Sequence, residues 1–343
     1  MITSVPERAS ASAILTTVVG SYPLPEWLRA YPTRDHLRDA TLVVVRAQEL
    51  AGIDVVADGE LSRFDVNHPE TNGMIDYFTG QLDGVSARLT QADRAEFAGR
   101  TDMGYRVAPA GTVNGPIGPG TLDLAQPAAL LRTLTTRRTK FTLTSPYMLS
   151  RVLLDRSYGD RQALAMAIGA VLRDQAALID ADIVQVDEAS LTGHPEDGKW
   201  AAEAINQVLS GVRGQKAVHL CFGNYGGQTI QSGHYRKLIE FMNALDADHV
   251  VLECAHRDPQ ELEELRGLSS RLGVGLGVID VKSLVIESAD EVARRIERGA
   301  AIVGVERIRY VNPDCGLWML PRSVADSKLR ALVAGRDRFL GRA

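Results

Sequence analysis

The sequence predicts a (β/α)8 barrel, and three features of the chain carry that prediction. The chain has 343 residues, 45% of them hydrophobic, which is sufficient for one large barrel domain. Eight short apolar runs rich in β-branched residues follow one another, and most precede a segment with helical periodicity. Runs that are apolar on both faces are typical of parallel strands covered by helices. Repeated strand–helix alternation of this kind indicates a closed barrel.

The expected strands comprise residues 16–21, 54–60, 140–145, 182–188, 216–221, 249–254, 275–280 and 308–314. An open doubly wound sheet is the alternative fold, and it would carry a glycine-rich phosphate-binding turn after its first strand. The chain reads GSYPLP at residues 20–25, which is not such a turn. The barrel is therefore the favoured architecture.

Helices are expected at residues 160–181, 259–272, 289–298 and 324–339. In the first of these, Leu164, Ile168 and Leu172 fall on one stripe, as in an amphipathic helix packed on a sheet. Asp258 directly precedes the second segment and is the expected N-cap.

Two stretches interrupt the alternation. Residues 64–115, between the second and third strands, are polar and punctuated by glycine, and residues 105–113 are expected to form a hairpin over the barrel mouth. Residues 191–199 form a shorter loop after the fourth strand. We expect a flexible tail at residues 1–12 and a single catalytic domain at residues 13–343.

Composition excludes several classes of partner. The net charge is -5 with acidic and basic residues interleaved, and aromatic residues make up only 6%, so neither nucleic acid nor an anionic lipid surface is an expected partner. No run approaches the roughly 20 apolar residues that span a bilayer. Three cysteines are too few and odd in number for a disulfide framework. We expect a cytoplasmic protein.

A metal site is the sharpest functional signal. His219 and Cys221 are two residues apart on an expected strand, so both side chains point to the same side. Such a pair alone is more often part of a core, but Glu253 and Cys315 close two further strands of the same barrel edge. A set of one imidazole, two thiolates and one carboxylate favours Zn²⁺. Cys254 should face the opposite side and be structural.

The charge of this set favours thiol activation over water activation. Two thiolates and one carboxylate leave a zinc centre with one net negative charge, which is unchanged when an incoming thiolate replaces the carboxylate. Asp187 either closes a salt bridge or binds the ammonium of an amino-acid substrate together with Glu60. The Gly20-Ser21 turn can hold a carboxylate.

These segments resemble the catalytic domain of the cobalamin-independent methionine synthase family. The matching pieces are TTVVGSYP (16–23), DGE (58–60), NGMIDYF (72–78), VQVDE (184–188), HLC (219–221), VLE (251–253) and VNPDCGL (311–317). The resemblance implies a barrel that binds zinc through His219, Cys221, Glu253 and Cys315. It also implies homocysteine bound through Gly20, Ser21, Glu60 and Asp187, with a thiol that displaces Glu253 and attacks a methyl group.

Three departures concern the methyl donor. The family's second, N-terminal barrel has no counterpart here, and the tryptophan that stacks on the pterin is missing from residues 145–155. Where the family has a proton-donating histidine in Asp-Ile-His-Ser, this chain has Lys282 in Asp280-Val281-Lys282-Ser283. Lys282 and Asp187 are therefore the candidate catalytic residues, with Lys282 alternatively a salt-bridge partner of Asp280 or Asp187.

Three functions remain open. The first is methyl transfer to homocysteine, similar to the 5-methyltetrahydropteroyltriglutamate–homocysteine methyltransferases, from a folate or from a methyl-donor protein. The second is another alkyl transfer to a thiol, as in the epoxyalkane–coenzyme M transferases. Glu60 and Asp187 suit an ammonium better than a sulfonate, which favours homocysteine. The third is a zinc-storing barrel without activity, for which acidic side chains at the mouth would be a stability cost.

Overall fold

The computed structural model describes residues 14–65, 73–100, 106–224 and 233–342. Its main sheet has eight parallel strands in the order β1-β11-β10-β9-β8-β7-β5-β2. They are β1 (Leu15–Thr16), β2 (Val55–Val56), β5 (Arg138–Thr144), β7 (Ile183–Glu188), β8 (Gln215–Leu220), β9 (His249–Leu252), β10 (Gly273–Ile279) and β11 (Ile308–Pro313). A parallel bridge from Thr17 to Val55 joins the two ends of this order, next to β1 and in β2, and so closes the barrel.

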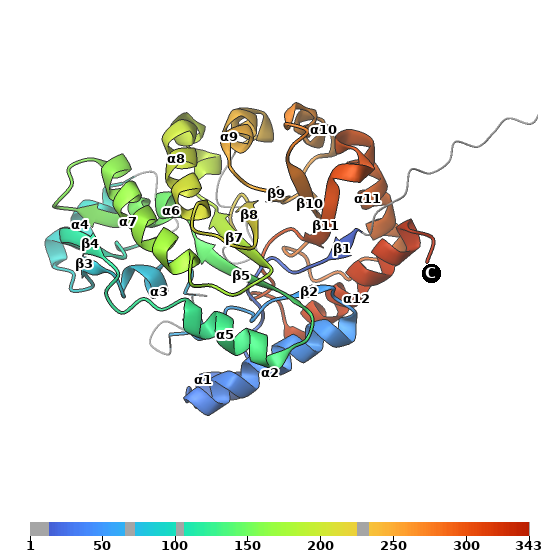
Figure 1. The fold of residues 1–343 in the computed structure, drawn as a ribbon, viewed down its shortest axis with the longest axis horizontal. Coiled ribbons are helices and arrows are strands. Elements are labelled where there is room, and N and C mark those ends of the chain that lie inside the picture. The colour runs from blue at the N-terminus through green and yellow to red at the C-terminus, as the bar shows by residue number, and fades with distance from the viewer. Residues whose placement is uncertain (1–13, 66–72, 101–105, 225–232, 343) are drawn as a thin grey trace, which may run out of the picture.

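Helices surround the strands, which occupy the middle of the molecule (Figure 1). The longer ones are α2 (Arg34–Ala51), α5 (Ala125–Leu134), α7 (Arg161–Ala176), α8 (Gly198–Leu209), α11 (Ala289–Val303) and α12 (Arg322–Phe339). The shorter ones are α1 (Glu26–Ala30), α3 (Asp76–Thr79), α4 (Gln91–Ala98), α6 (Pro146–Arg151), α9 (Ile239–Ala244) and α10 (Pro259–Leu262). The predicted (β/α)8 barrel is confirmed.

The barrel strands are buried on both faces, as their composition predicts. Inside the barrel, Val19, Val55, Ile183, Val251 and Tyr310 belong to a small separate apolar cluster. A much larger cluster fills the space between the sheet and the helices. Apolar contacts thus fix the strands from both sides, which leaves their carboxyl ends as a rigid edge for functional side chains.

The predicted insertion between the second and third barrel strands is present, but its hairpin differs from the expected one. β4 (Gly111–Gly118) pairs antiparallel with β3 (Asp83–Ser86) and parallel with β6 (Leu153–Asp155). The expected hairpin at residues 105–113 is therefore wrong in its bounds, and Tyr105 lies outside the described residues. The small sheet lies beside α7, at the side of the barrel in Figure 1. Its strand β4 contacts α7, which belongs to the layer of helices around the barrel.

The predicted helices differ from the observed ones mainly in length. Asp258 caps α10 through Gln260 N–H at 2.8 Å, as expected, but α10 stops at Leu262 and a 3-10 turn, Glu263–Gly267, follows. The predicted continuous helix over 259–272 is therefore wrong, because β10 begins at Gly273 and the chain must leave the helix before that residue to enter it. Residues 191–197 form two 3-10 turns before α8.

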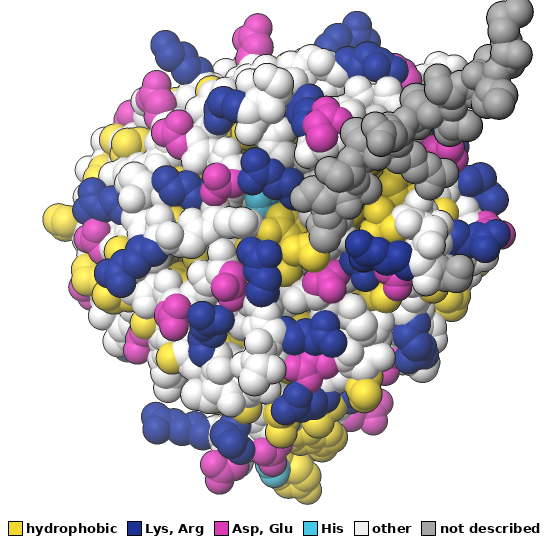
Figure 2. Space-filling view, turned by 45° about the vertical axis from the view of Figure 1, so that its right-hand side comes forward, with side chains coloured by type: hydrophobic (Ala, Val, Ile, Leu, Met, Phe, Trp, Pro, Cys, Tyr) yellow, Lys and Arg dark blue, Asp and Glu magenta, His cyan; other side chains and the backbone are white. Residues whose placement is uncertain are grey.

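Both signs of charge are mixed on the face of the molecule that Figure 2 draws. On the face drawn in Figure 2, Lys and Arg alternate with Asp and Glu, and hydrophobic side chains lie between them. Within the described ranges, no helix is long and apolar enough to cross a membrane.

Candidate metal and amino-acid site

Parallel register brings the candidate residues of neighbouring strands to one level. Asp187 of β7 is level with His219 of β8, and His219 is level with Val251 of β9. Residues two apart on a strand share a face, so Cys221 and Glu253 lie one step further toward the carboxyl edge. Cys315 follows β11 directly, after Asp314. The alternation of barrel strands therefore gathers these side chains at the predicted edge.

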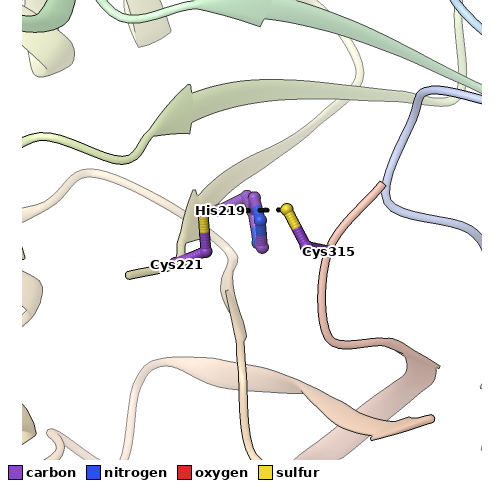
Figure 3. Close-up of side chains that lie close together, drawn as sticks. All are labelled: His219, Cys221 and Cys315. Carbon is purple, nitrogen blue, oxygen red and sulfur yellow. Dashed lines mark hydrogen bonds between the residues drawn. The ribbon is translucent and has the colours of Figure 1, made fainter. Parts of the chain in front are cut away.

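Three of the four predicted metal ligands form one group. One ring nitrogen of His219 and the sulfurs of Cys221 and Cys315 lie within 4.8 Å of one another. The sulfurs are 3.8 Å apart, and all three side chains converge between β8 and the segment after β11 (Figure 3). His219 and Cys221 are almost fully buried. A soft donor set at this spacing is suited to one tetrahedral metal ion.

The histidine is prepared to act as a ligand. Its Nδ1 lies 3.1 Å from the carbonyl oxygen of Val251, which accepts but cannot donate, so Nδ1 carries the proton. The other nitrogen, Nε2, is buried and has no hydrogen-bond partner within the described ranges. A buried lone pair without a partner costs free energy, which a metal ion at this position would recover.

The two cysteines differ in their protonation. The contact with the Cys221 sulfur lowers the pKa of Cys315 to about 5, against the opposing effect of burial. The same contact, together with burial, raises the pKa of Cys221 well above its usual range. One thiolate is therefore present near neutral pH, and the second proton leaves only when a cation compensates the second charge.

Glu253, the fourth predicted ligand, is engaged elsewhere in this structure. Its Oε1 accepts from Nζ of Lys282 at 2.7 Å, and its Oε2 accepts from the Phe222 N–H at 3.3 Å. Lys282 itself is turned toward the barrel after β10, where its backbone N–H donates to Asp280 Oδ1 at 2.8 Å. The ion pair of Lys282 is thus with Glu253, and not with Asp280 or Asp187 as the sequence suggested.

Glu60 stands beside Gly20 in an unusual backbone conformation. It has a φ of 61°, and among the described residues it is the one non-glycine residue in the left-handed region. Its carboxylate accepts from the Thr142 hydroxyl at 2.6 Å and lies 3.3 Å from the Arg63 guanidinium. A Cβ on Gly20 would lie 2.2 Å from Glu60 Oε1, so this approach requires a glycine. Conformational cost of this kind is typical of functional sites.

Ser21 connects the region around Glu60 to the segment that carries Cys315. Its carbonyl accepts from the Leu317 N–H at 2.8 Å. A Cβ on Gly316, next to Cys315, would lie 1.9 Å from the Ser21 hydroxyl oxygen. The Gly20-Ser21 turn therefore touches Glu60 on one side and the segment carrying Cys315 on the other.

Asp187 faces the same interior as Glu60. Burial, and then the charge of Glu60, raise the pKa of Asp187 to about 7. Gln185 Nε2 donates to Asp187 Oδ1 at 2.7 Å, and Gln185 Oε1 accepts from the buried Lys140 at 2.9 Å. A buried carboxylate whose proton affinity is raised in this way is suited to bind a cationic group such as an ammonium.

Several of these residues were not predicted from the sequence: Arg63, Lys140, Thr142 and Gln185. Lys140 and Gln185 are buried polar residues in the middle of β5 and β7, and Arg63 lies three residues after Glu60. An inward-facing polar residue in a fully buried strand was the signal that could have found them.

Other candidates lie outside the site. Cys254 packs between the barrel and the helices, as expected. His194 bonds to Arg151 at 2.7 Å, and the side chain of His256 is exposed, while His68 lies outside the described residues. Glu188 accepts from the Ser190 and Leu191 N–H groups and holds the loop before α8.

Comparison with known proteins identifies the family. The model of the cobalamin-independent synthase catalytic domain matches residues 14–336. A methionine synthase of Thermococcus kodakarensis is 30% identical, with 93% of this chain and 91% of the relative covered. A 2-hydroxypropyl-CoM lyase of Xanthobacter autotrophicus is also 30% identical, with 96% and 95% covered.

A solved structure supports the same assignment. A B12-independent methionine synthase from Shewanella sp. W3-18-1, in complex with selenomethionine, superposes with a TM-score of 0.79 and 26% identity and covers 96% of this chain and 98% of that one. The fold, the converging ligand atoms and the sequence agree on one family. The chain belongs to the cobalamin-independent methionine synthase family, in its catalytic domain.

Proposed function

We propose that this protein is a zinc-dependent methyltransferase that methylates the thiol of homocysteine and so forms methionine. The observation that carries the proposal is the meeting of two sites. A group of one imidazole and two cysteine sulfurs, with one buried nitrogen unpaired, lies beside a pair of buried carboxylates. The first suits a thiol-binding metal and the second suits an ammonium.

We propose that His219, Cys221 and Cys315 hold the zinc ion, with Glu253 as the fourth ligand from the protein. Zinc bound there would lower the pKa of a substrate thiol and keep it nucleophilic at neutral pH. The soft sulfur donors favour zinc over Mg²⁺ or Ca²⁺. Burial of His219 and Cys221 excludes water from the protein side of this group and strengthens its electrostatic interactions.

The remaining residues bind and orient the amino acid. Asp187 and Glu60 pair with the substrate ammonium, and the Gly20-Ser21 turn holds its carboxylate. Support comes from the contact of Gly20 with Glu60 and of Ser21 with Gly316, which fix both ends of the amino acid relative to Cys315. The Shewanella relative was solved with selenomethionine, the selenium analogue of the product proposed here.

The methyl donor differs from that of the folate-dependent enzymes in our proposal. Lys282 stands where those enzymes have a proton-donating histidine, and its ammonium is committed to Glu253. A donor whose leaving group needs no proton, such as a methyl-corrinoid protein, fits this arrangement better than a methylfolate. We place the protein in the cytoplasm, with one catalytic domain over residues 13–343, and the three unpaired cysteines support a reducing compartment.

A second candidate function is alkyl transfer to coenzyme M, which the similarity to the 2-hydroxypropyl-CoM lyase favours. A sulfonate requires a cationic partner beside the metal site. Lys282 is already paired with Glu253, and Arg63 is paired with Glu60. The acidic pair Asp187 and Glu60 would instead repel a sulfonate.

One set of assays separates these functions. The purified protein, loaded with zinc, is incubated with homocysteine or coenzyme M and with methylfolate, methylcobalamin or an epoxide. We expect methionine from homocysteine with methylcobalamin and little product from coenzyme M. Alkylation of coenzyme M by the epoxide would support the second function, and full activity of Cys315→Ser would contradict both. A gain of methylfolate activity in Lys282→His would show that residue 282 selects the donor.

A further inference from the structure

The barrel interior holds a short row of polar side chains between its apolar cluster and the amino-acid site. Lys140 of β5 is level with Ile183 of β7, which belongs to the apolar cluster inside the barrel. Gln185 and Asp187 follow Ile183 at every second position of β7, so they face the same interior, successively nearer the carboxyl edge. Lys140 and Gln185 are fully buried. Polar groups without contact to water cost free energy unless each has a hydrogen-bond partner.

Hydrogen bonds join these side chains in one direction. Lys140 Nζ donates to Gln185 Oε1 at 2.9 Å, and Gln185 Nε2 donates to Asp187 Oδ1 at 2.7 Å. Gln185 Nε2 also donates to the carbonyl oxygen of Val19 at 3.0 Å. An ammonium only donates, and a carboxylate and a carbonyl only accept, so the amide of Gln185 has one favourable orientation. A rotated amide would place its oxygen against two acceptors and its nitrogen against a donor.

The Val19 contact ties Gln185 to the turn that is proposed to hold the substrate carboxylate. Val19 directly precedes the Gly20-Ser21 turn. The turn also has support that does not involve Gln185, since the Leu317 N–H donates to the Ser21 carbonyl at 2.8 Å. Gln185 thus bridges Asp187, the proposed partner of the ammonium, and the backbone next to the turn. Its loss would free the Asp187 carboxylate, while the turn keeps its own hydrogen bond.

We propose that Gln185, with its amide oriented by Lys140, is a positioning residue that holds the Asp187 carboxylate in place relative to the Gly20-Ser21 turn. The inference rests on the proposed function, since it requires Asp187 to pair with the substrate ammonium. In an α-amino acid a single carbon atom separates the ammonium from the carboxylate, so the two binding groups must keep a fixed spacing. A thiol without an amino group gains nothing from this spacing. Gln185 therefore favours α-amino-acid thiols by acting through Asp187.

The test compares two ligands of the full-length, zinc-loaded protein by isothermal titration calorimetry. They are methionine and 4-(methylthio)butanoic acid, which differs from methionine only by the missing amino group. Gln185→Met removes the donor that faces Asp187 and keeps a side chain of similar volume. It should weaken methionine binding roughly tenfold, or about 1.4 kcal/mol, because binding must then supply the lost orientation of the carboxylate. Binding of the amine-free ligand should change by less than about threefold.

A double-mutant cycle shows whether Gln185 acts through Asp187. In an Asp187→Asn background, Gln185→Met should change methionine affinity by less than about threefold, because the group that it positions no longer carries a charge. Gln185→Met alone leaves the buried Lys140 without its hydrogen-bond acceptor. The variant Lys140→Met/Gln185→Met removes that lysine as well, and it should show the same tenfold loss, so it carries the test if the single variant does not fold.

Tyr310→Phe is the matched control. Tyr310 belongs to the apolar cluster inside the barrel, and its hydroxyl donates to Gln215 Oε1 at 2.6 Å. Gln215 is level with Ile183, at the end of the strands opposite Asp187. The control thus removes a hydrogen bond inside the same barrel but outside the row. Its loss should lower the melting temperature and leave the affinities for both ligands unchanged.

The outcomes separate this inference from the proposed function. Equal weakening of both ligands by Gln185→Met would overturn the inference, because Gln185 would then support the barrel in general and not Asp187. Methionine binding as tight as in Tyr310→Phe, or a tenfold loss that persists beside Asp187→Asn, would overturn it as well. A wild-type protein that does not bind methionine, or an Asp187→Asn protein that binds it as tightly as the wild type, would overturn the proposed function of the site itself.

Discussion

Replacing Gly20 by alanine tests the link between the Gly20-Ser21 turn and Glu60. The new Cβ would lie 2.2 Å from Glu60 Oε1 and 3.1 Å from Cγ2 of Thr142. Carbon atoms do not approach oxygen this closely, so the Glu60 carboxylate must move and weaken its 2.6 Å hydrogen bond from Thr142. Loss of one hydrogen bond to a charged group costs about 1.5–3 kcal/mol.

If Glu60 binds the substrate ammonium, the displaced carboxylate should lower the affinity for methionine roughly ten- to hundredfold, at about 1.4 kcal/mol per factor of ten. Isothermal titration calorimetry with methionine measures this directly, without a methyl donor. Gly115→Ala is the control, since nothing lies within 4 Å of a Cβ at that position. A Gly20→Ala protein that is folded and binds methionine as tightly as Gly115→Ala would refute the assignment of Glu60.

Two other predictions concern pH and stability. Because the pKa of Asp187 is raised to about 7, the side chain is neutral below that pH and cannot pair with an ammonium. Methionine affinity should therefore fall as pH falls through 7, by up to about tenfold per pH unit, and Asp187→Asn should remove the dependence. In the packing of α11 on α12, a Cβ on Gly335 would lie 2.3 Å from Val292. Gly335→Ala should lower the free energy of unfolding by about 1–3 kcal/mol in urea titrations, and equal stability would show that the helices can shift.

The barrel could be predicted from the sequence because its signal is repeated. Eight runs apolar on both faces have few alternatives to a helix-covered parallel sheet, and an error in one strand leaves the architecture unchanged. The insertion lacked this redundancy. β3 and β4 are joined through a loop that includes α4, and β4 also pairs with β6, so its pairing depends on contacts far apart in the sequence.

The site was predictable where strand geometry alone decides it. His219 and Cys221 share a face because they are two residues apart, and Cys315 joins them because β11 ends at the same edge. The partner of Lys282 was not predictable, since a flexible side chain at a strand end can reach several carboxylates. Asp280 lies two residues before Lys282 and Glu253 directly follows the neighbouring strand β9, and the sequence alone does not decide which carboxylate the ammonium contacts. The left-handed conformation of Glu60 had no signal in sequence beyond the adjacent Gly59.

The central claim is that His219, Cys221 and Cys315 bind one zinc ion, and metal analysis by mass spectrometry tests it most directly. The wild-type protein and Cys254→Ala, whose sulfur packs between the barrel and the helices, should each contain about one zinc ion per chain. Cys315→Ala should contain close to none under the same purification, because it removes one of three converging ligands. Equal zinc content in Cys315→Ala and Cys254→Ala, or no zinc in the wild type, would contradict the account.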